Sequence, residues 1–570
     1  MNMKTWNMCG TAVVLAAAML WLSGCVETDA DKRENAPTHE IAKADQYAID
    51  VLETYYLWNE EIEKDLARLD PDTCRMPMEV VKGIRYHEGG KEVDRWTVLT
   101  DDLKSFRNSV QGLGITYGYD LQAGRITNKP GEYFLVVSCV SNGGPAHKAG
   151  LRRGDIIITL DGRAITEENI YDAFNSYSIN LGVTGLDGNG NISGDVRTVS
   201  LKAVDMYEDP VLVDKTFDVA GKKIGYLAYS AFDLNSSRTL PDVFRRFKSE
   251  NIDELILDLR YNGGGYAFTE NVLASMIAPM ANVLAGDIFQ TEVYNSILAE
   301  AWKKQGEDTN TYFSTVHEIS SQKLKIDVSD ANPGISKVYV IVTGGTASAS
   351  EGLIVGLKPY MDVELVGQRT YGKYCAGILL APDQFYSSRY DYSLIQDWGM
   401  YVMISKFADC NGRNASIPDG IPVDVQADDN PFDGYQLGDE NETMLRAALQ
   451  AAGKTYPKSA SVTRSYSKAI DLTPLDHGAP RGILIRTEIE GDDFVILHSG
   501  TSDCYPHSES GFLCWFERIS GHAQPGKPAN FHAPLLVCRE HCRNCPAVPP
   551  GGKQRQNQID AHPKRPAFIS

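Results

Sequence analysis

Residues 222–455 contain short apolar runs separated by stretches with helical character. The runs include "IGYLAYSAF", "ELILDLR", "VYVIVT" and "VELVG", and "TLPDVFRRFKSE" lies between the first two. Alternation of this kind predicts an α/β layer with a mainly parallel sheet. The later segment "ENETMLRAALQAAGK" is expected to form a closing helix for that layer.

The chain has 570 residues, which is too many for one ordinary hydrophobic core. We expect an α+β multidomain protein. Its predicted parts are 1–24, a signal peptide; 25–45, an acidic tether; 46–109, an N-terminal helical region; 110–206, a β-rich module; 207–460, the α/β core; and 461–570, a poorly ordered or aberrant tail.

The N-terminus has the pattern of an export signal. Lys4 precedes the twelve-residue apolar run "TAVVLAAAMLWL", which is too short to span a bilayer but right for a signal peptide. The following "LSGC" resembles the bacterial lipobox, and this resemblance implies that Cys25 is lipidated and anchors the protein to a membrane. We therefore expect a cell-envelope lipoprotein of the outer membrane, on its periplasmic or its surface face. An ordinary cleaved signal is the alternative.

Charge and cysteine content narrow the possible partners and cofactors. The formal net charge of −20 argues against nucleic acid as a partner, because phosphate binding needs a basic face. Nine cysteines remain besides Cys9 and Cys25, an odd number at irregular spacing, so no disulfide framework is predicted; a Cys375–Cys410 bridge stays open. The run "CREHCRNC" at 538–545 is a single tight cluster, whereas structural zinc sites pair two. We expect no metal and no cofactor.

The run "GGTASASEG", residues 344–352, lies between the apolar run "VYVIVT" and "LIVGLKPYM". This order predicts a strand-to-helix corner with Ser348 at the N-terminus of the helix. Unpaired backbone amides and the helix dipole would stabilise a developing oxyanion there. The alternative is a serine that only caps the helix.

A serine nucleophile needs a base, and no histidine lies in residues 318–476. Lys373 follows the apolar run "VELVG" and a polar turn, so burial against the sheet end could keep its amine neutral. A solvated surface lysine is the alternative. In "LILDLRYNGGGY", residues 255–266, three glycines follow an apolar strand, and their amides could face a ligand. Here the alternative is a plain tight turn.

These three stretches, in this order, resemble the carboxyl-terminal processing peptidases, also called tail-specific proteases. The chain shares their "ASASE" run, a "TYGK" motif whose lysine lies 25 residues after the serine, and "DLRYNGGG". The resemblance implies that Ser348 is the nucleophile and Lys373 the base, and the spacing argues against Ser350. It also implies that the amides of Gly264 and Ala349 bind the oxyanion.

Gly264 is preferred over Gly263 as a donor because the family often has proline, which has no amide hydrogen, at the position of Gly263. One departure from the family is Gly377, which stands where many members have a glutamine that orients the lysine.

Residues 110–206 resemble a PDZ domain through "PAHKAGLRRGDII" and the carboxylate-binding loop "GLGI". A PDZ groove adds a peptide as an extra strand and binds its terminal carboxylate with backbone amides. The resemblance implies that protein or peptide substrates are selected by their C-termini. The residues expected to contact the peptide are Gly112, Leu113, Gly114 and Ile115.

Three hypotheses follow. In the first, the chain is a serine endopeptidase with a Ser/Lys dyad. In the second, Gly377 marks a lost site and the chain is a catalytically inactive, PDZ-containing peptide-binding lipoprotein. In the third, the cysteine- and histidine-rich tail is a metal site. Only the first predicts cleavage that depends on Ser348.

Overall fold

The computed structural model describes residues 38–456, except 127, 128, 130, 188–191, 193 and 414–418, together with 473–474 and 483–485. The predicted signal peptide, Cys25 and the cluster at 538–545 lie outside the described residues. All four cysteines that the structure describes are free thiols, including Cys375 and Cys410, so the bridge between these two is absent. Among the helices of the described residues, none is long and apolar enough to cross a bilayer.

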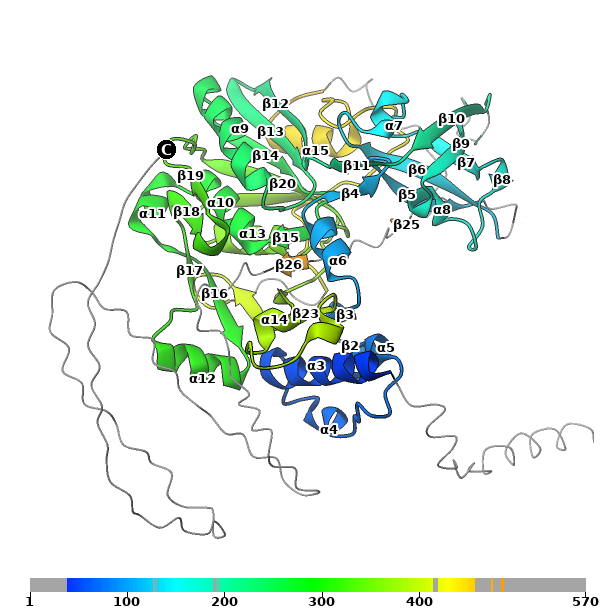
Figure 1. Ribbon diagram of the computed structural model, residues 1–570. Coiled ribbons are helices and arrows are strands. Elements are labelled where there is room, and N and C mark those ends of the chain that lie inside the picture. The colour runs from blue at the N-terminus through cyan, green and yellow to red at the C-terminus, as the bar shows by residue number, and fades with distance from the viewer. Residues whose placement is uncertain are drawn as a thin grey trace, which may run out of the picture. The chain divides into compact units, whose positions relative to one another are not determined.

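A six-stranded sheet forms the centre of the α/β core (Figure 1). Five of its strands are parallel, each paired with the next in the order, and only the edge strand β12 is antiparallel to its neighbour, which confirms the predicted, mainly parallel sheet. The order is β12 (Val211–Val219), β13 (Lys222–Tyr229), β14 (Glu254–Asp258), β20 (Lys337–Val342), β21 (Asp362–Gly367) and β24 (Val425–Gln426).

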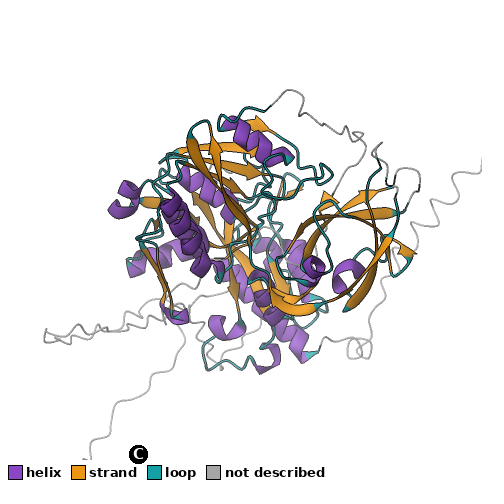
Figure 2. Ribbon diagram, turned by 90° about the horizontal axis from the view of Figure 1, so that it is seen from above, coloured by secondary structure: helices purple, strands orange, loops and turns teal. Residues whose placement is uncertain are grey.

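Helices cover both faces of this sheet, which explains why its strands read as continuous apolar runs. In β14, Leu255 and Leu257 pack in the larger core cluster, whereas Ile256 packs on the opposite face with Met444 and Leu449. Figure 2 shows helices beside the strands of this layer. The helices that contribute most are α9 (Ser236–Glu250), α10 (Ala267–Ile277) and α13 (Ala349–Leu357) on the first face and α15 (Thr443–Ala451) on the second.

A second sheet packs beside the first and includes a strand from the predicted tail. Its order is β15 (Gly264–Tyr266), β26 (Ile483–Ile485), β22 (Cys375–Leu380), β23 (Gly399–Ala408), β16 (Ile288–Tyr294) and β17 (Thr311–Tyr312), with β3 (Val98–Thr100) on β23. Figure 1 shows β26, in orange, beside β15.

The tail 461–570, predicted to be poorly ordered or aberrant, therefore contributes two short strands to the fold. β26 is one of them, and the other is β25 (Thr473–Pro474), which pairs with a strand of the β-rich module. An apolar run of only three residues, "ILI", is too short to show a periodicity, but the two strands on either side of it supply backbone partners.

The N-terminal helix begins earlier than the predicted boundary at residue 46. Helix α3 spans His39–Tyr55, and the Thr38 side chain accepts a hydrogen bond from the Ile41 amide at 3.3 Å, which caps its first turn. Ala44, in the second turn, is fully buried, so the residues before 46 include part of the packed helix rather than only an acidic tether.

The β-rich module, 110–206, has its own sheet and its own core. The sheet order is β10 (Arg197–Lys202), β9 (Ser178–Thr184), β7 (Ile156–Leu160), β6 (Tyr133–Val140), β5 (Tyr119–Arg125) and β25, with β8 (Arg163–Ala164) on β7. A separate pair joins β4 (Leu113–Thr116) to β11 (Val204–Tyr207).

The remaining elements are short or lie at the periphery. They are α4 (Glu63–Leu66), α5 (Pro77–Ile84), α6 (Leu103–Val110), α7 (Pro145–Lys148), α8 (Asp172–Asn175), α11 (Met280–Ala285), α12 (Ser296–Gln305), α14 (Pro382–Phe385), β1 (His87–Glu88), β2 (Lys91–Glu92), β18 (Val316–Ile319), β19 (Leu324–Asp327) and the 3₁₀ turns Ser320–Gln322 and Ser393–Ile395.

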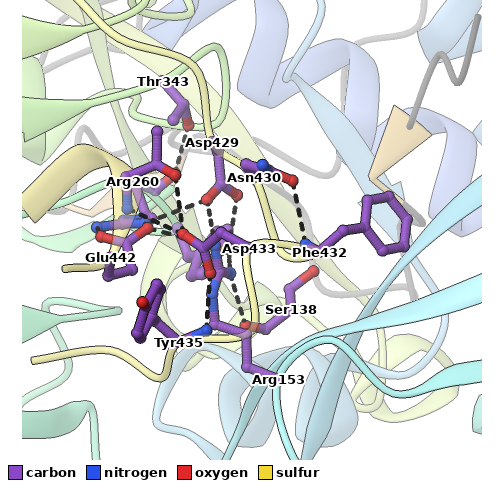
Figure 3. Close-up of polar contacts among 12 residues, drawn as sticks. Ser138, Arg153, Arg260, Thr343, Asp429, Asn430, Phe432, Asp433, Tyr435 and Glu442 are labelled. Carbon is purple, nitrogen blue, oxygen red and sulfur yellow. Dashed lines mark hydrogen bonds and ion pairs between the residues drawn. The ribbon is translucent and has the colours of Figure 1, made fainter. Parts of the chain in front are cut away.

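A buried ionic network fastens the β-rich module to the core (Figure 3). Arg153 of the module donates to Asp429 at 2.6 Å, and Arg260 of the core donates to Asp429 at 3.1 Å and to Glu442 at 2.6 Å. Burial alone would raise the pKa of Asp429, but the two guanidinium groups outweigh burial and hold this pKa well below its usual range. Because Arg260 immediately precedes "YNGGG", the module is tied to the strand end expected to form the site.

Candidate active site

Ser348 occupies the predicted strand-to-helix corner. β20 ends at Val342, α13 begins at Ala349, and Ser348 is the N-cap residue. Its backbone has φ 62° and ψ −115°, a conformation that costs a residue with a side chain about 1–3 kcal/mol and that clusters at functional sites. The side chain is fully buried, and among the described residues its Oγ has no hydrogen-bond partner. A buried hydroxyl without a partner on a strained corner is unusual for a residue that only caps a helix.

The glycine-rich loop and the serine loop are bonded to each other. The Asn262 carbonyl accepts from the Ala347 amide at 3.2 Å and from the Ser350 hydroxyl at 3.1 Å. The Thr346 hydroxyl donates to the Leu259 carbonyl at 2.8 Å. Ser350 therefore has a structural bond of its own, and that it is not the nucleophile stays a prediction.

Lys373 is buried, as the sequence predicted for a base. Its side chain is fully inaccessible, and burial lowers its pKa to about 8, although Cys375, Asp94 and Glu351 partly oppose that shift. The Nζ atom donates to the Tyr401 hydroxyl at 3.0 Å. A substantial fraction of this amine is therefore neutral near pH 8 and able to accept a proton.

Glu351 links the serine and the lysine. One of its oxygens, Oε2, accepts from the Ser348 amide at 3.0 Å and from the Lys373 amide at 2.8 Å, so these two backbone nitrogens lie within about 6 Å of each other. The other oxygen accepts from the Thr370 hydroxyl at 2.6 Å and from the Gly372 amide at 2.8 Å. Burial raises the pKa of Glu351, and these four hydrogen bonds limit the rise.

The two predicted oxyanion donors differ in their surroundings. Ala349 is the first residue of α13, so its amide has no acceptor one turn back within the helix. The Gly264 amide donates to Asn262 Oδ1 at 2.9 Å in this structure. Oxyanion binding by Gly264 stays a prediction, and it would require the Asn262 side chain to release that bond.

The predicted peptide-binding loop lies at β4. Gly112 has φ 64°, a value that favours glycine, and a side chain there would meet the Glu208 carbonyl at 3.1 Å. One edge of β4 pairs with β11, and its other edge faces no strand in the described part of the chain. Leu113 and Ile115 are both exposed, at 38% and 65%. This strand has the unpaired edge and the apolar side chains that an added peptide strand needs.

Three residues beside the dyad were not identified from sequence. Glu351 lies inside the "ASASE" run, three residues after the serine, and that spacing is a capping-box signal. Tyr401 and Trp96 place their rings 5.1 Å from Lys373 Nζ, and they come from β23 and from the N-terminal region. Contacts over such sequence distances leave no local signal.

The comparisons with known proteins agree with this architecture. Residues 223–427 match Peptidase family S41, and residues 136–174 match the PDZ domain. Together, the fold and these matches define a class, an α/β peptidase core that carries a PDZ module. Over these residues the chain is similar to the C-terminal processing peptidases.

Two related peptidases are similar to this chain over slightly less than half of its length. The chain is 28% identical over 282 residues to the chloroplastic C-terminal processing peptidase of Tetradesmus obliquus, covering 46% of this chain and 52% of that protein. It is 25% identical over 285 residues to the chloroplastic carboxyl-terminal-processing peptidase 2 of Arabidopsis thaliana, covering 48% of each. The chain thus spans about half the length of the curated relatives it matches.

A solved structure supports the fold over a larger share. A Bacteroides fragilis protein described as an S41 protease superposes with a TM-score of 0.56 at 22% identity, covering 71% of this chain and 96% of that one.

Proposed function

We propose that the chain is a serine endopeptidase in which Ser348 is the nucleophile and Lys373 the general base. The observation that carries this proposal is the buried lysine, with a pKa near 8, held next to the strained serine by one carboxylate oxygen of Glu351. A lysine activates a serine only when its amine is neutral, and burial supplies that condition.

In the proposed mechanism, neutral Lys373 takes the hydroxyl proton of Ser348 while Oγ attacks the scissile carbonyl. The amides of Ala349 and Gly264 stabilise the oxyanion. The lysine ammonium then gives its proton to the leaving amine, and an acyl-enzyme ester remains on the serine. Water, deprotonated by the same lysine, hydrolyses the ester and restores the hydroxyl.

We further propose that the PDZ module selects substrates by their C-termini at β4. The support is the unpaired edge of β4, with Leu113 and Ile115 exposed along it. To test this, a peptide with an apolar free C-terminus is compared with the same peptide carrying a C-terminal amide. We expect a higher KM for the amidated peptide, and an Ile115→Asp variant should lose the difference. Equal KM values in the wild type would contradict C-terminal selection.

The peptidase core also accepts an extended segment close to the proposed dyad. Residues 483–485 lie between β15 and β22 as a parallel strand, with Ile483 opposite Gly264 and Ile485 opposite Gly377. Neighbouring strands are about 4.8 Å apart, so this segment is as near to Gly264 as a substrate strand would be. This supports a substrate bound in extended form.

We also propose that the protein is a lipoprotein of the cell envelope, anchored through Cys25. The support is the N-terminal sequence, with Lys4, a twelve-residue apolar run and "LSGC". Metabolic labelling with a radioactive fatty acid tests this. Label should enter the wild type and be absent from Cys25→Ser; label that persists in Cys25→Ser would contradict the anchor.

A further inference from the structure

The space beside Lys373 is filled by a side chain that the sequence motifs do not predict. A Cβ atom added to Gly377 would lie 2.7 Å from Tyr401 Cε2, 2.8 Å from Tyr401 Cζ and 2.5 Å from Met403 Cε. These distances are too short for any real Cβ. The Tyr401 ring therefore occupies the volume that a residue larger than glycine at 377 would need, and its hydroxyl accepts a hydrogen bond from Lys373 Nζ at 3.0 Å.

We propose that Tyr401 is the positioning residue for the lysine base, and that Gly377 is glycine because the Tyr401 ring needs its space. The proposal rests on the function proposed above. It implies that Gly377 marks a different way of orienting the lysine rather than a lost site.

A tyrosine hydroxyl at this place has the properties that orientation requires. Tyr401 is 1% exposed, its strand β23 pairs with β22 and with β16, and its ring packs 5.9 Å from the ring of Phe106. Its position is therefore determined by packing. A hydroxyl also accepts a hydrogen bond from the amine without adding a full negative charge, so it fixes the direction of Nζ and favours the charged amine less strongly than a carboxylate would.

The position of the lysine amine has a large effect on the rate of proton transfer. The lysine stem can rotate about several bonds, and a displacement of about 1 Å of a reacting group costs on the order of a hundredfold. Trp96, 5.1 Å from Nζ, limits the movement of the amine from the side of the N-terminal region. Tyr401 contacts the amine directly, through a hydrogen bond.

The first test compares two tyrosine substitutions in the full chain. Tyr401→Phe removes the hydroxyl and keeps the ring, and we expect kcat to fall roughly tenfold to a hundredfold with little change in KM. Tyr47→Phe is the matched control, because Tyr47 is also fully buried. Its hydroxyl donates at 2.9 Å to the Leu380 carbonyl of β22, the strand that contains Gly377. It should leave kcat unchanged. If Tyr401→Phe retains the wild-type kcat, the proposal is wrong.

The second test addresses Gly377. Gly377→Ala should displace the tyrosine ring and lower kcat, whereas Gly83→Ala, at a helical glycine with open space around it, should not. The double variant Gly377→Gln, Tyr401→Ala places an amide where the hydroxyl was, and it should recover part of the activity that Tyr401→Ala loses. Full activity in Gly377→Ala would contradict the proposed packing.

A third readout does not depend on proteolysis. The Lys373 amine is followed by NMR of ¹³Cε-labelled lysine, with Lys373→Met to assign the signal. Loss of the hydroxyl removes an acceptor that favours the charged amine, so the titration midpoint in Tyr401→Phe should move to lower pH. An unchanged midpoint overturns the proposal even if the wild type proves inactive, and inactivity of the wild type itself contradicts only the proposed function.

Discussion

The guanidinium group of Arg153, in the PDZ module, donates to the carboxylate of Asp429, in the peptidase core, at 2.6 Å. Both groups are almost completely buried. Removal of one partner from a buried pair leaves an uncompensated charge, which typically costs about 3–5 kcal/mol.

Arg153→Ala should therefore lower the free energy of unfolding by up to roughly 3 kcal/mol. The loss is smaller to the extent that Arg260, which donates to the same carboxylate, still compensates its charge. Arg197→Ala is the control, since Arg197 forms an exposed ion pair with Asp155 in the same module and should cost at most about 1 kcal/mol. Urea unfolding measures both. Equal effects of the two substitutions would show that the buried network does not hold the module in place.

Glu351→Gln should reduce activity strongly although Glu351 transfers no proton. The carboxylate accepts hydrogen bonds from the backbone amides of Ser348 and Lys373. A glutamine has an NH₂ group in place of one of the two oxygens, so a donor would face an amide donor. We expect a fall in kcat with a loss of about 1–3 kcal/mol in stability. Ser350→Ala is the comparison in the same helix turn, because it loses one neutral hydrogen bond and should cost about 1 kcal/mol and little activity. Wild-type kcat in Glu351→Gln would contradict the role given to Glu351.

Activity should rise with pH through a midpoint near 8. The base must be neutral, and the pKa of Lys373 is lowered to about 8 by burial. Single-turnover acylation between pH 6 and 10 measures this midpoint. A flat profile would mean that Lys373 is not the titrating base.

The same burial makes Lys373 costly for stability. Its folded-state pKa of about 8 is below the unfolded value of about 10.4, so the cost is full below pH 8 and disappears as the pH rises through 10.4. Lys373→Met should stabilise the fold at pH 7 by about 1–3 kcal/mol, and the gain should vanish above pH 10.4. A loss of stability at pH 7 would contradict the lowered pKa of the buried lysine.

The strand formed by 483–485 should compete with substrate. Proline is poorly tolerated between two strands, so Leu484→Pro should free the space next to Gly264 and increase kcat/KM severalfold. A peptide covering 479–489 should inhibit this variant, and a scrambled peptide should not. Unchanged kcat/KM in a folded Leu484→Pro variant would show that the segment does not obstruct the site.

Much of the site could be predicted because its signals are local. The strand, the small residues and the helix around Ser348 are adjacent in sequence, and so are the strand and turn before Lys373. Tyr401 and Trp96 could not be predicted, because they reach the lysine from β23 and from the N-terminal region through tertiary packing. The start of α3 at His39 was not predicted because residues 39–46, "HEIAKADQ", contain only one large apolar residue, although Ala44 packs in the core.

The central claim is the Ser348/Lys373 dyad, and cleavage of an unstructured protein such as casein tests it most directly. The full chain is compared as wild type, Ser348→Ala, Ser350→Ala and Lys373→Ala, with thermal unfolding to confirm that each variant is folded. We expect wild type and Ser350→Ala to cut casein, and Ser348→Ala and Lys373→Ala to be slower by at least about a hundredfold. Cleavage by Ser348→Ala at the wild-type rate, or none by a folded wild type with an apolar C-terminal peptide present, would contradict the dyad.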